Sequence, residues 1–105
     1  NKYNLIKEFY DIDKIISVND FMAIEEFIEE NEYFELYENL SKLAFEEYPA
    51  TILPSYYKGR FFEKTGNPEK AMHLYRSAYN MNEVEGLTKD YLIELADRIK
   101  EDFNF

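Results

Sequence analysis

Apolar residues recur along the chain every three or four positions, and no useful stretch alternates between apolar and polar positions. The first spacing is typical of helices with one buried face, whereas alternation would indicate strands. Cap and turn residues divide the pattern into helices at 4–16, 21–30, about 33–48, 52–65 and about 68–82, and into a last helix after residue 88. The sequence therefore predicts an all-α fold of five or six helices joined by short turns.

Individual cap and turn residues set the boundaries of these helices. Asn19 or Asp20 is expected to cap the helix that begins at residue 21. Pro49 ends the next helix, because a residue that precedes proline avoids the α region. Gly66 supplies a left-handed turn and Asn67 caps the following helix. Thr51 and Thr88 are predicted to cap the helices at 52 and 89.

The helical spacing also predicts which side chains are buried. The buried stripe of the helix at 33–48 comprises Phe34, Tyr37, Leu40, Ala44 and Phe45. The buried stripe of the last helix comprises Leu92, Leu95, Ala96, Ile99 and Phe103. Aromatic residues make up 18% of the chain, as ten Tyr and nine Phe. They are expected to fill gaps between helices, although a surface for stacking sugars or bases is the alternative.

The chain matches itself after a shift of 34 residues, which places residues 18–51 on 52–85. Identical residues then coincide at five pairs of positions: Phe27 and Phe61, Glu29 and Glu63, Glu35 and Glu69, Leu40 and Leu74, and Ala44 and Ala78. The same shift superposes both predicted helices and both turns. A helical hairpin repeated at this period predicts two stacked units, 18–51 and 52–85, after a helical lead-in at 1–17 and before a capping helix at 86–105.

The second unit resembles tetratricopeptide repeats. Small residues of that family's pattern are matched by Gly59, Ala71 and Ala78, its aromatic positions by Phe62 and Tyr75, and its turn glycine by Gly66. Ser55, Lys58 and Glu83 depart from the pattern, and the first unit follows it less closely. The resemblance implies two antiparallel helix hairpins stacked side by side, with the first helix of each pair on a concave face.

A second resemblance concerns residues 53–103, which are similar to the C-terminal helical tails of bacterial esterases of the enterochelin-esterase-like α/β-hydrolase group. The similarity rests on the helix at 56–59, on the turn and helix GNPEKAMHLYRSAY, and on the closing TKDYLIELADRIKEDF. It implies an accessory or protein-interaction domain of a larger hydrolase, with a Ser-His-Asp site upstream. The alternative is that these helices cover or complete the ester-binding site. The first residue, Asn1 rather than Met, also indicates a fragment.

The net charge of −10 is concentrated in one part of the chain, since residues 18–51 carry Asp20 and nine Glu against Lys42 alone. An acidic chain repels phosphate backbones, so nucleic acid is not expected as a partner. The glutamates could attract a basic partner or form a solvated helix face. No sequence segment is apolar enough to span a membrane, and no secretory signal is visible, so the compartment stays open.

No catalytic, cofactor or metal site is predicted. The sequence has no cysteine and no Gly-x-Ser-x-Gly motif, and its one histidine, His73, is expected to point outward from its helix. Pairs of glutamates one turn apart in residues 25–30 lack the mixed ligands of a strong metal site. We therefore expect the chain to be catalytically inert.

The concave face of the repeat is the predicted binding surface. The 34-residue register places on it Met22, Glu26, Glu29 and Glu30 from the first unit, and Tyr56, Arg60, Glu63 and Lys64 from the second. Arg60 and Lys64 would form a basic patch suited to a peptide carboxylate, with Tyr56 and Tyr57 as exposed anchors. The expected partner is a protein or peptide, an upstream domain of the same parent chain, or a second copy.

Overall fold

The computed structural model describes residues 17–105, so the helix predicted at 4–16 lies outside the described part of the chain. The helices are α2 (Val18–Asn31), α3 (Leu36–Glu47), α4 (Leu53–Lys64), α5 (Pro68–Ser77) and α6 (Lys89–Phe103), with a 3₁₀ turn, η1 (Ala78–Asn80), after α5. No strand forms within residues 17–105, which confirms the all-α prediction. No helix in this range is long and apolar enough to cross a membrane.

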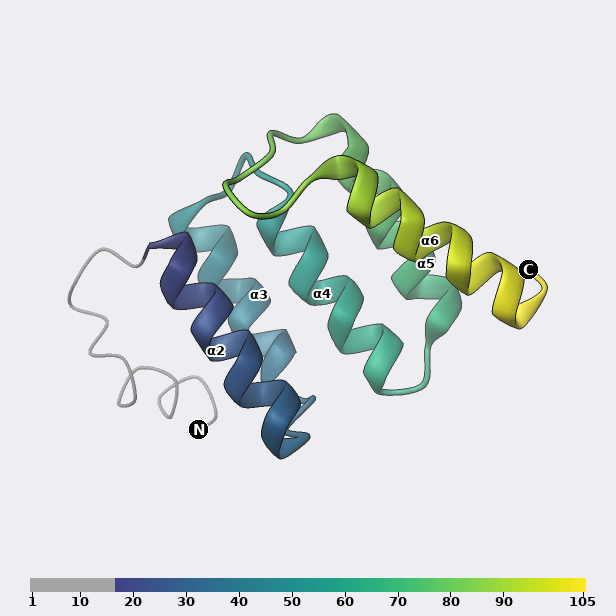
Figure 1. The fold of residues 1–105 in the computed structure, drawn as a ribbon, viewed down its shortest axis with the longest axis horizontal. Helices are drawn as coiled ribbons and strands as arrows, with labels where there is room; N and C mark the ends of the chain where they lie inside the picture. Colours follow the sequence, from purple (N-terminus) through teal and green to yellow (C-terminus); the bar gives the residue numbers. More distant parts are fainter. Residues whose placement is uncertain (1–16) are drawn as a thin grey trace.

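Consecutive helices lie beside one another (Figure 1). α3 packs against α4, α4 against α5, and α5 against α6. α2 and α3 form one antiparallel hairpin, α4 and α5 form the second, and α6 covers the outer side of α5. This arrangement confirms the predicted pair of helix hairpins with a C-terminal covering helix.

The predicted caps are found at α5 and α6 but not at α2 and α4. At α4 the N-cap is Ile52 rather than Thr51, and the Thr51 hydroxyl accepts only from the N–H of Leu53, at 3.3 Å. Asn67 and Thr88 accept hydrogen bonds from the backbone N–H groups of Lys70 and Tyr91. At α2 the cap is Ser17 rather than Asn19 or Asp20, since the Ser17 hydroxyl accepts from the Asp20 N–H and the Asp20 carboxylate accepts from the Ser17 N–H. This reciprocal capping box satisfies two free N–H groups and moves the start of the helix back to residue 18.

The two hairpins turn through left-handed backbone at equivalent positions. Gly66 follows α4 with φ +94°, as predicted. Glu32 lies 34 residues earlier, ends α2 with φ 55°, and has backbone that a residue with a Cβ adopts only at a cost. The left-handed residues of the two turns are thus 34 residues apart, although glycine occupies only one of the two positions.

The backbone at the base of the second hairpin is closed by hydrogen bonds. The N–H of Ile52 donates to the carbonyl of Asn82 at 2.8 Å, and the N–H of Asn82 donates to the carbonyl of Ala50 at 3.1 Å. These bonds form an isolated bridge between the residues that precede α4 and those that follow η1. We refer to this bridge as the base clamp of the second hairpin.

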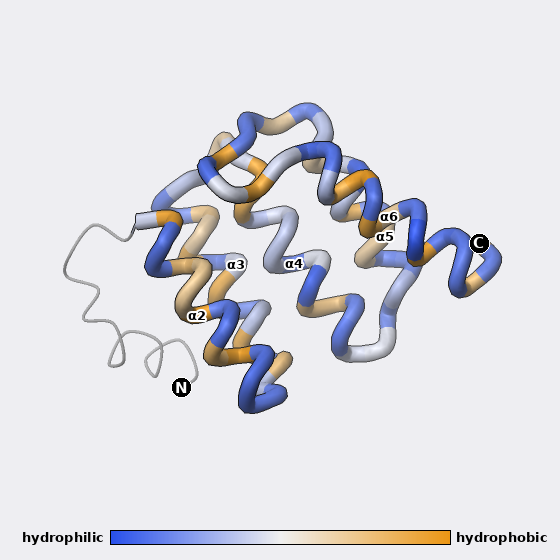
Figure 2. The backbone as a smooth tube through the Cα atoms, viewed as in Figure 1, coloured by the Kyte–Doolittle hydropathy of each residue, from blue (hydrophilic) through white to orange (hydrophobic). Residues whose placement is uncertain are grey.

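The core runs through both hairpins and α6, and its three largest fully buried side chains are Tyr37, Tyr57 and Tyr75. Each turn of α2 and α6 contains both hydrophilic and hydrophobic residues (Figure 2), as expected for helices with one buried face. A Cβ built on Gly59 would lie 2.7 Å from Cδ1 of the Tyr75 ring and closer still to Cε1. α4 and α5 therefore approach so closely that only glycine fits at position 59.

Two residues of the predicted buried stripes are exposed. Phe45 is 63% exposed, because the buried face of α3 centres on Leu40, Leu43 and Ala44 and leaves Phe45 on the flank. Phe103 is 56% exposed, since the last turn of α6 extends beyond the end of α5 (Figure 1). Both predictions of burial were wrong because a helical stripe has edges whose burial depends on the neighbouring helix.

Candidate interaction surfaces

The structure joins α2 to α4 at the centre of the predicted concave face. Glu29 of α2 accepts a hydrogen bond from Arg60 of α4 at 3.1 Å and lies 3.6 Å from the ammonium group of Lys64. On its other side Arg60 meets Glu63 at 3.4 Å. Arg60 therefore lies between two carboxylates, Glu29 and Glu63, that are separated by 34 residues in the sequence.

Three tyrosine hydroxyls complete this arrangement. Tyr37 donates to Glu29 at 2.6 Å, Tyr75 to Glu63 at 2.7 Å, and Tyr56 to Glu25 at 2.5 Å. We call the whole set the carboxylate–tyrosine network; its members are Glu25, Glu29, Tyr37, Tyr56, Arg60, Glu63, Lys64 and Tyr75. It links α2, α3, α4 and α5, so it ties the two hairpins together on this face.

Burial governs the electrostatics of the network. Burial raises the pKa of the Glu25 carboxyl above its ordinary value, and the hydrogen bond from Tyr56 opposes that rise without cancelling it. Burial also raises the pKa values of Tyr37, Tyr56 and Tyr75, so these phenols stay neutral donors. Burial opposes the charge of Arg60, but the surrounding phenol and carboxylate oxygens outweigh it and raise the pKa of the guanidinium.

Five of the eight predicted surface residues belong to the network, and the other three lie apart from it. Met22 packs partly buried against the core, whereas Glu26 and Glu30 are exposed on α2. Arg60 and Lys64 do not form a free basic patch, since both face Glu29. A peptide carboxylate at this place would have to displace a carboxylate of the protein itself.

Tyr56 and Tyr57 are buried rather than exposed, so the prediction that they act as exposed anchors was wrong. Tyr56 is 4% exposed, and the Tyr57 ring stacks between those of Phe21 and Tyr37, with centroids 6.0 and 6.2 Å away. The reason is the central place of α4, which has helices on several sides. The hydroxyl of Tyr57 and Nε of Arg60 are buried without a hydrogen-bond partner among the described residues.

Sequence reasoning missed Glu25, Tyr37 and Tyr75 as members of the network. Tyr37 and Tyr75 were assigned to the buried stripe or to space filling, which is correct for their rings but says nothing of their hydroxyls. Glu25 lies one turn before Glu29, so its position on the same face of α2 was the one available signal. The partners of these groups come from other helices and depend on tertiary packing.

The groups that could carry chemistry are separated from one another. His73 is exposed on α5, while Ser41 and Ser77 donate to backbone carbonyls within their own helices. No group of three or more His, Cys, Asp or Glu side chains in residues 17–105 is arranged to hold a metal ion. The polar side chains of residues 17–105 thus lie on the surface or in internal ion pairs.

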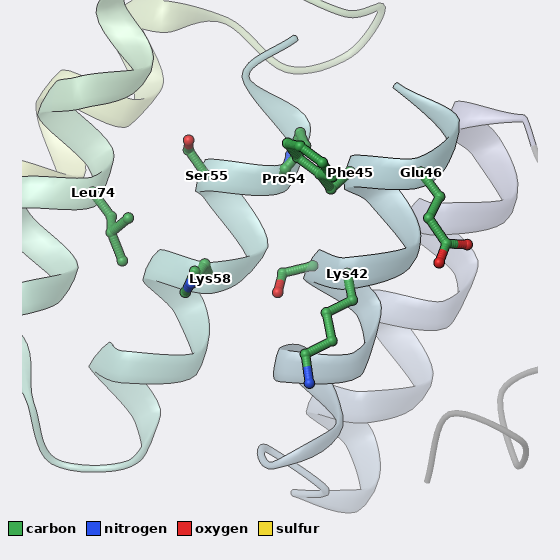
Figure 3. A pocket seen from close by; sticks show the side chains of 8 residues that line it. Lys42, Phe45, Glu46, Pro54, Ser55, Lys58 and Leu74 are labelled. Atoms are coloured by element: carbon green, nitrogen blue, oxygen red, sulfur yellow. The ribbon is translucent and has the colours of Figure 1, made fainter. Parts of the chain in front are cut away.

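A second surface lies across α3, α4 and α5, where a groove of about 460 Å³ opens (Figure 3). Phe45 and Lys42 come from α3, Pro54, Ser55 and Lys58 from α4, and Leu74 from α5. No pattern in the sequence predicted this α3–α5 groove. It exists because Phe45 remains outside the core.

No known family profile matches the chain, and no curated protein matches it. Among solved structures, the chain is similar to an uncharacterised protein from Capnocytophaga ochracea DSM 7271, with a TM-score of 0.84 and 23% sequence identity. The match covers 96% of this chain and 30% of that protein, so the chain spans less than a third of that protein's length. At this level of identity the similarity shows a shared all-helical fold.

Proposed function

We propose that the chain is a non-catalytic helical-repeat domain of the tetratricopeptide-like kind, which serves as an accessory or protein-interaction domain of a larger protein. The observation that carries the proposal is the equivalence of Glu29 and Glu63 around Arg60. The left-handed backbone at Glu32 and Gly66 supports the same 34-residue register. Stacked hairpins of this type act through the surfaces that they present to partners.

The internal pairing of the polar groups supports an interaction role over a catalytic one. Glu29 and Glu63 each accept hydrogen bonds from a tyrosine and from Arg60, so neither is poised to take a proton from a substrate. An ester hydrolase needs a nucleophile within reach of a base that a third group orients. His73 lies on an exposed face of α5, and Ser41 and Ser77 hydrogen-bond to their own helices.

The exposed carboxylates of α2 are the part of the concave face that is free to meet a partner. Glu26 and Glu30 lie one turn apart, and neither makes an ion pair within residues 17–105. Residues 18–51 carry most of the negative charge of the chain. A basic surface on the partner therefore fits this part of the face, with Met22 as an adjoining apolar contact.

The larger protein in this proposal is a bacterial esterase of the enterochelin-esterase-like group, with this chain as its C-terminal tail. The sequence similarity of residues 53–103 supports the parent, and the Capnocytophaga protein supports the occurrence of such a fold within a longer polypeptide. The alternative keeps the same parent but places these helices over the ester site. The two hypotheses predict different losses of esterase activity when the helices are removed.

Removal of residues 17–105 from the parent esterase distinguishes an accessory domain from a role at the ester site. An accessory domain leaves kcat/KM for a small aryl ester within about threefold, and the purified 105 residues bind the catalytic domain or another partner in trans. A fall of more than a hundredfold in kcat/KM would instead favour the role at the ester site. Glu26→Lys with Glu30→Lys should weaken the binding in trans at least tenfold, whereas Glu94→Lys with Glu101→Lys on α6 should not.

The isolated chain gives a second and independent test. The 105 residues should hydrolyse an activated aryl ester no faster than buffer does, with or without a divalent metal ion. Turnover that disappears in His73→Ala would overturn the non-catalytic assignment. His73 is exposed, so this substitution is not expected to disturb the fold.

A further inference from the structure

We propose that the α3–α5 groove binds the C-terminal end of α6, residues 101–105, from a second copy of this chain. The inference goes beyond the proposed function, because it concerns the face opposite the network and a partner contained in the sequence. It rests on the groove, on two unpaired donors at its wall, and on an aromatic tip of matching chemistry.

The surface that lines the groove is mostly apolar. Phe45 stands at one wall with 63% of its surface exposed, Leu74 forms the opposite wall, and Pro54 lies between them (Figure 3). An exposed phenylalanine beside other apolar groups is costly in water unless a partner covers it. The volume of about 460 Å³ accommodates an aromatic side chain.

The wall of the groove also presents hydrogen-bond donors. Within residues 17–105, the ammonium group of Lys58 makes no ion pair and the hydroxyl of Ser55 makes no hydrogen bond. These residues lie one turn apart on α4 and both line the groove. Lys42, across the groove, meets Glu38 only in an exposed pair at 3.4 Å. Glu46 also lines the groove, so its charged side chains are two ammonium groups, Lys42 and Lys58, and one carboxylate. In a chain of net charge −10, this small excess of positive charge suits a carboxylate next to an apolar group.

The end of α6 has the complementary chemistry. Phe103 and Phe105 are 56% and 46% exposed, and their rings stack with centroids 6.0 Å apart. The preceding residues, Glu101 and Asp102, are exposed carboxylates. Asn104 ends the helix with φ 58°, and the Phe105 N–H donates to the Lys100 carbonyl at 3.2 Å, so the two rings are held in place before any binding.

A second copy is needed because the tip does not reach its own groove. α6 ends at one extremity of the molecule, whereas α3 lies toward the other (Figure 1). The resulting contact joins two different surfaces, so each copy keeps one groove and one tip free for further copies. The contact is small and both chains are acidic, so the association is weak and needs physiological salt to screen the overall repulsion.

Sedimentation velocity of the whole chain in 0.15 M NaCl tests the proposal between about 10 μM and 1 mM. We expect the average mass to rise above 12.7 kDa with concentration. A groove variant, Phe45→Ser with Lys58→Gln, and a tip variant, Phe103→Ser with Phe105→Ser, should each weaken the association at least tenfold. A control variant, Tyr79→Ser with Lys70→Gln, changes exposed residues outside both surfaces and should associate as the original chain does.

Mixing the two impaired variants gives the decisive result. The tip variant retains its groove and the groove variant retains its tip, so the mixture should form a complex that stops at two chains. A constant monomer mass at every concentration would overturn the proposal, as would association that survives in either variant or a mixture that stays monomeric. All of the altered side chains are exposed, and circular dichroism confirms that each variant is folded before it is compared.

Discussion

The first and second hairpins share their topology, but the two helices of each pair pack at different distances. In the second hairpin the backbones of α4 and α5 run close together, since Gly59 leaves room for the ring of Tyr75. In the first hairpin α2 and α3 stand further apart. There the equivalent of Gly59 is Glu25, and the equivalent of Ala71 is Tyr37.

The same hairpin topology therefore forms at two different helix separations. Where small residues allow it, helices meet backbone to backbone and gain dispersion contacts. Where long side chains occupy those positions, the hydrogen bond from Tyr37 of α3 to Glu29 of α2 spans the wider gap. The bond from Tyr56 to Glu25 joins α2 to α4 of the second hairpin. α2 is therefore held by its buried apolar side chains, Phe21, Ile24 and Ile28, together with polar groups whose strength varies with pH and salt more than that of apolar packing does.

Gly59→Ala should break the close approach in the second hairpin and have the largest effect. The added methyl would overlap the ring of Tyr75, which is fully buried and hydrogen-bonded to Glu63. We expect a loss of about 2–3 kcal/mol in the free energy of unfolding from overpacking. This loss exceeds the gain of about 1 kcal/mol that alanine brings to a helix interior. Urea unfolding followed by circular dichroism measures the change.

Lys58→Ala is the matched control for that substitution, because Lys58 is the exposed neighbour of Gly59 on the same helix. Its free energy of unfolding should change by less than about 0.5 kcal/mol. A Gly59→Ala protein that is as stable as the original would contradict the described packing of α4 against α5.

Arg60→Met should loosen the attachment of the first hairpin to the second. The change removes the cation between Glu29 and Glu63 and keeps a side chain of similar length. We expect a loss of about 1–2 kcal/mol, below the value for a fully buried pair because both carboxylates are partly exposed. Hydrogen exchange followed by NMR should show faster exchange in α2 than in α5.

Arg98→Met serves as the comparison, since Arg98 forms an exposed pair with Glu94 on α6. That variant should lose less than about 0.5 kcal/mol and leave exchange in α2 unchanged. If Arg98→Met and Arg60→Met were equally destabilising, the network would not be what joins the two hairpins.

Substitutions at the two equivalent turns should change stability in opposite directions. Glu32→Gly relieves left-handed backbone at a residue with a Cβ and should stabilise the protein by about 0.5–1 kcal/mol. Gly66→Ala imposes the same conformation on alanine and should cost about 1 kcal/mol. A Cβ at Gly66 would meet no atom within 4 Å, so the backbone alone sets this cost. Thermal unfolding compares the pair, and equal signs would refute the equivalence of the turns.

The smallest effect concerns the pH dependence that Glu25 adds to the first hairpin. Burial raises the pKa of Glu25 in the folded protein above its ordinary value of 4.5. Between these two pKa values the folded state holds a proton that the unfolded state has released. The contribution of Glu25 to stability is therefore complete below pH 4.5 and is lost as the pH rises through the folded-state pKa.

Glu25→Gln tests this dependence, because the amide oxygen still accepts from Tyr56 and does not titrate. The other groups around Glu25 are Glu29 on α2, and Arg60 and neutral tyrosines on α3 and α4. The stability of the Gln variant relative to the original should increase as the pH rises from 4.5 to 7. Urea unfolding at several pH values measures it, and a difference that is constant with pH would contradict the assignment to Glu25.

The second hairpin was more predictable from sequence than the first, for a local reason. Its turn consists of residues with strong backbone preferences, Gly66, Asn67 and Pro68, and both helices start within one residue of the predicted positions. α5 ends at Ser77, earlier than the predicted end at about residue 82, because the chain continues as the 3₁₀ turn η1. The first hairpin turns at Glu32, whose preference is for a helix, so only the register indicated a turn there. Ser17 was missed as the cap of α2 because it lay outside the apolar pattern.

The surfaces were less predictable than the helices. Glu29, Arg60 and Glu63, which the sequence spacing grouped together, lie within ion-pair distance of one another in the structure. The spacing did not indicate that the charges neutralise one another or that Tyr56 is buried, since both depend on how closely α2 and α4 approach. Nor did it reveal the α3–α5 groove, whose wall is an aromatic residue, Phe45, expected in the core.

The base clamp of the second hairpin has a mechanical consequence. Its two backbone hydrogen bonds join Ala50 and Ile52 to Asn82, so tension applied through the ends of the chain passes across the clamp and bypasses α4 and α5. α2 and α6 lie outside the clamp and would peel away first. Residues 52–82, roughly 100 Å when extended, would lengthen only after both bonds break. In a longer polypeptide, the second hairpin is thus the part of this fold that yields last to a pulling force.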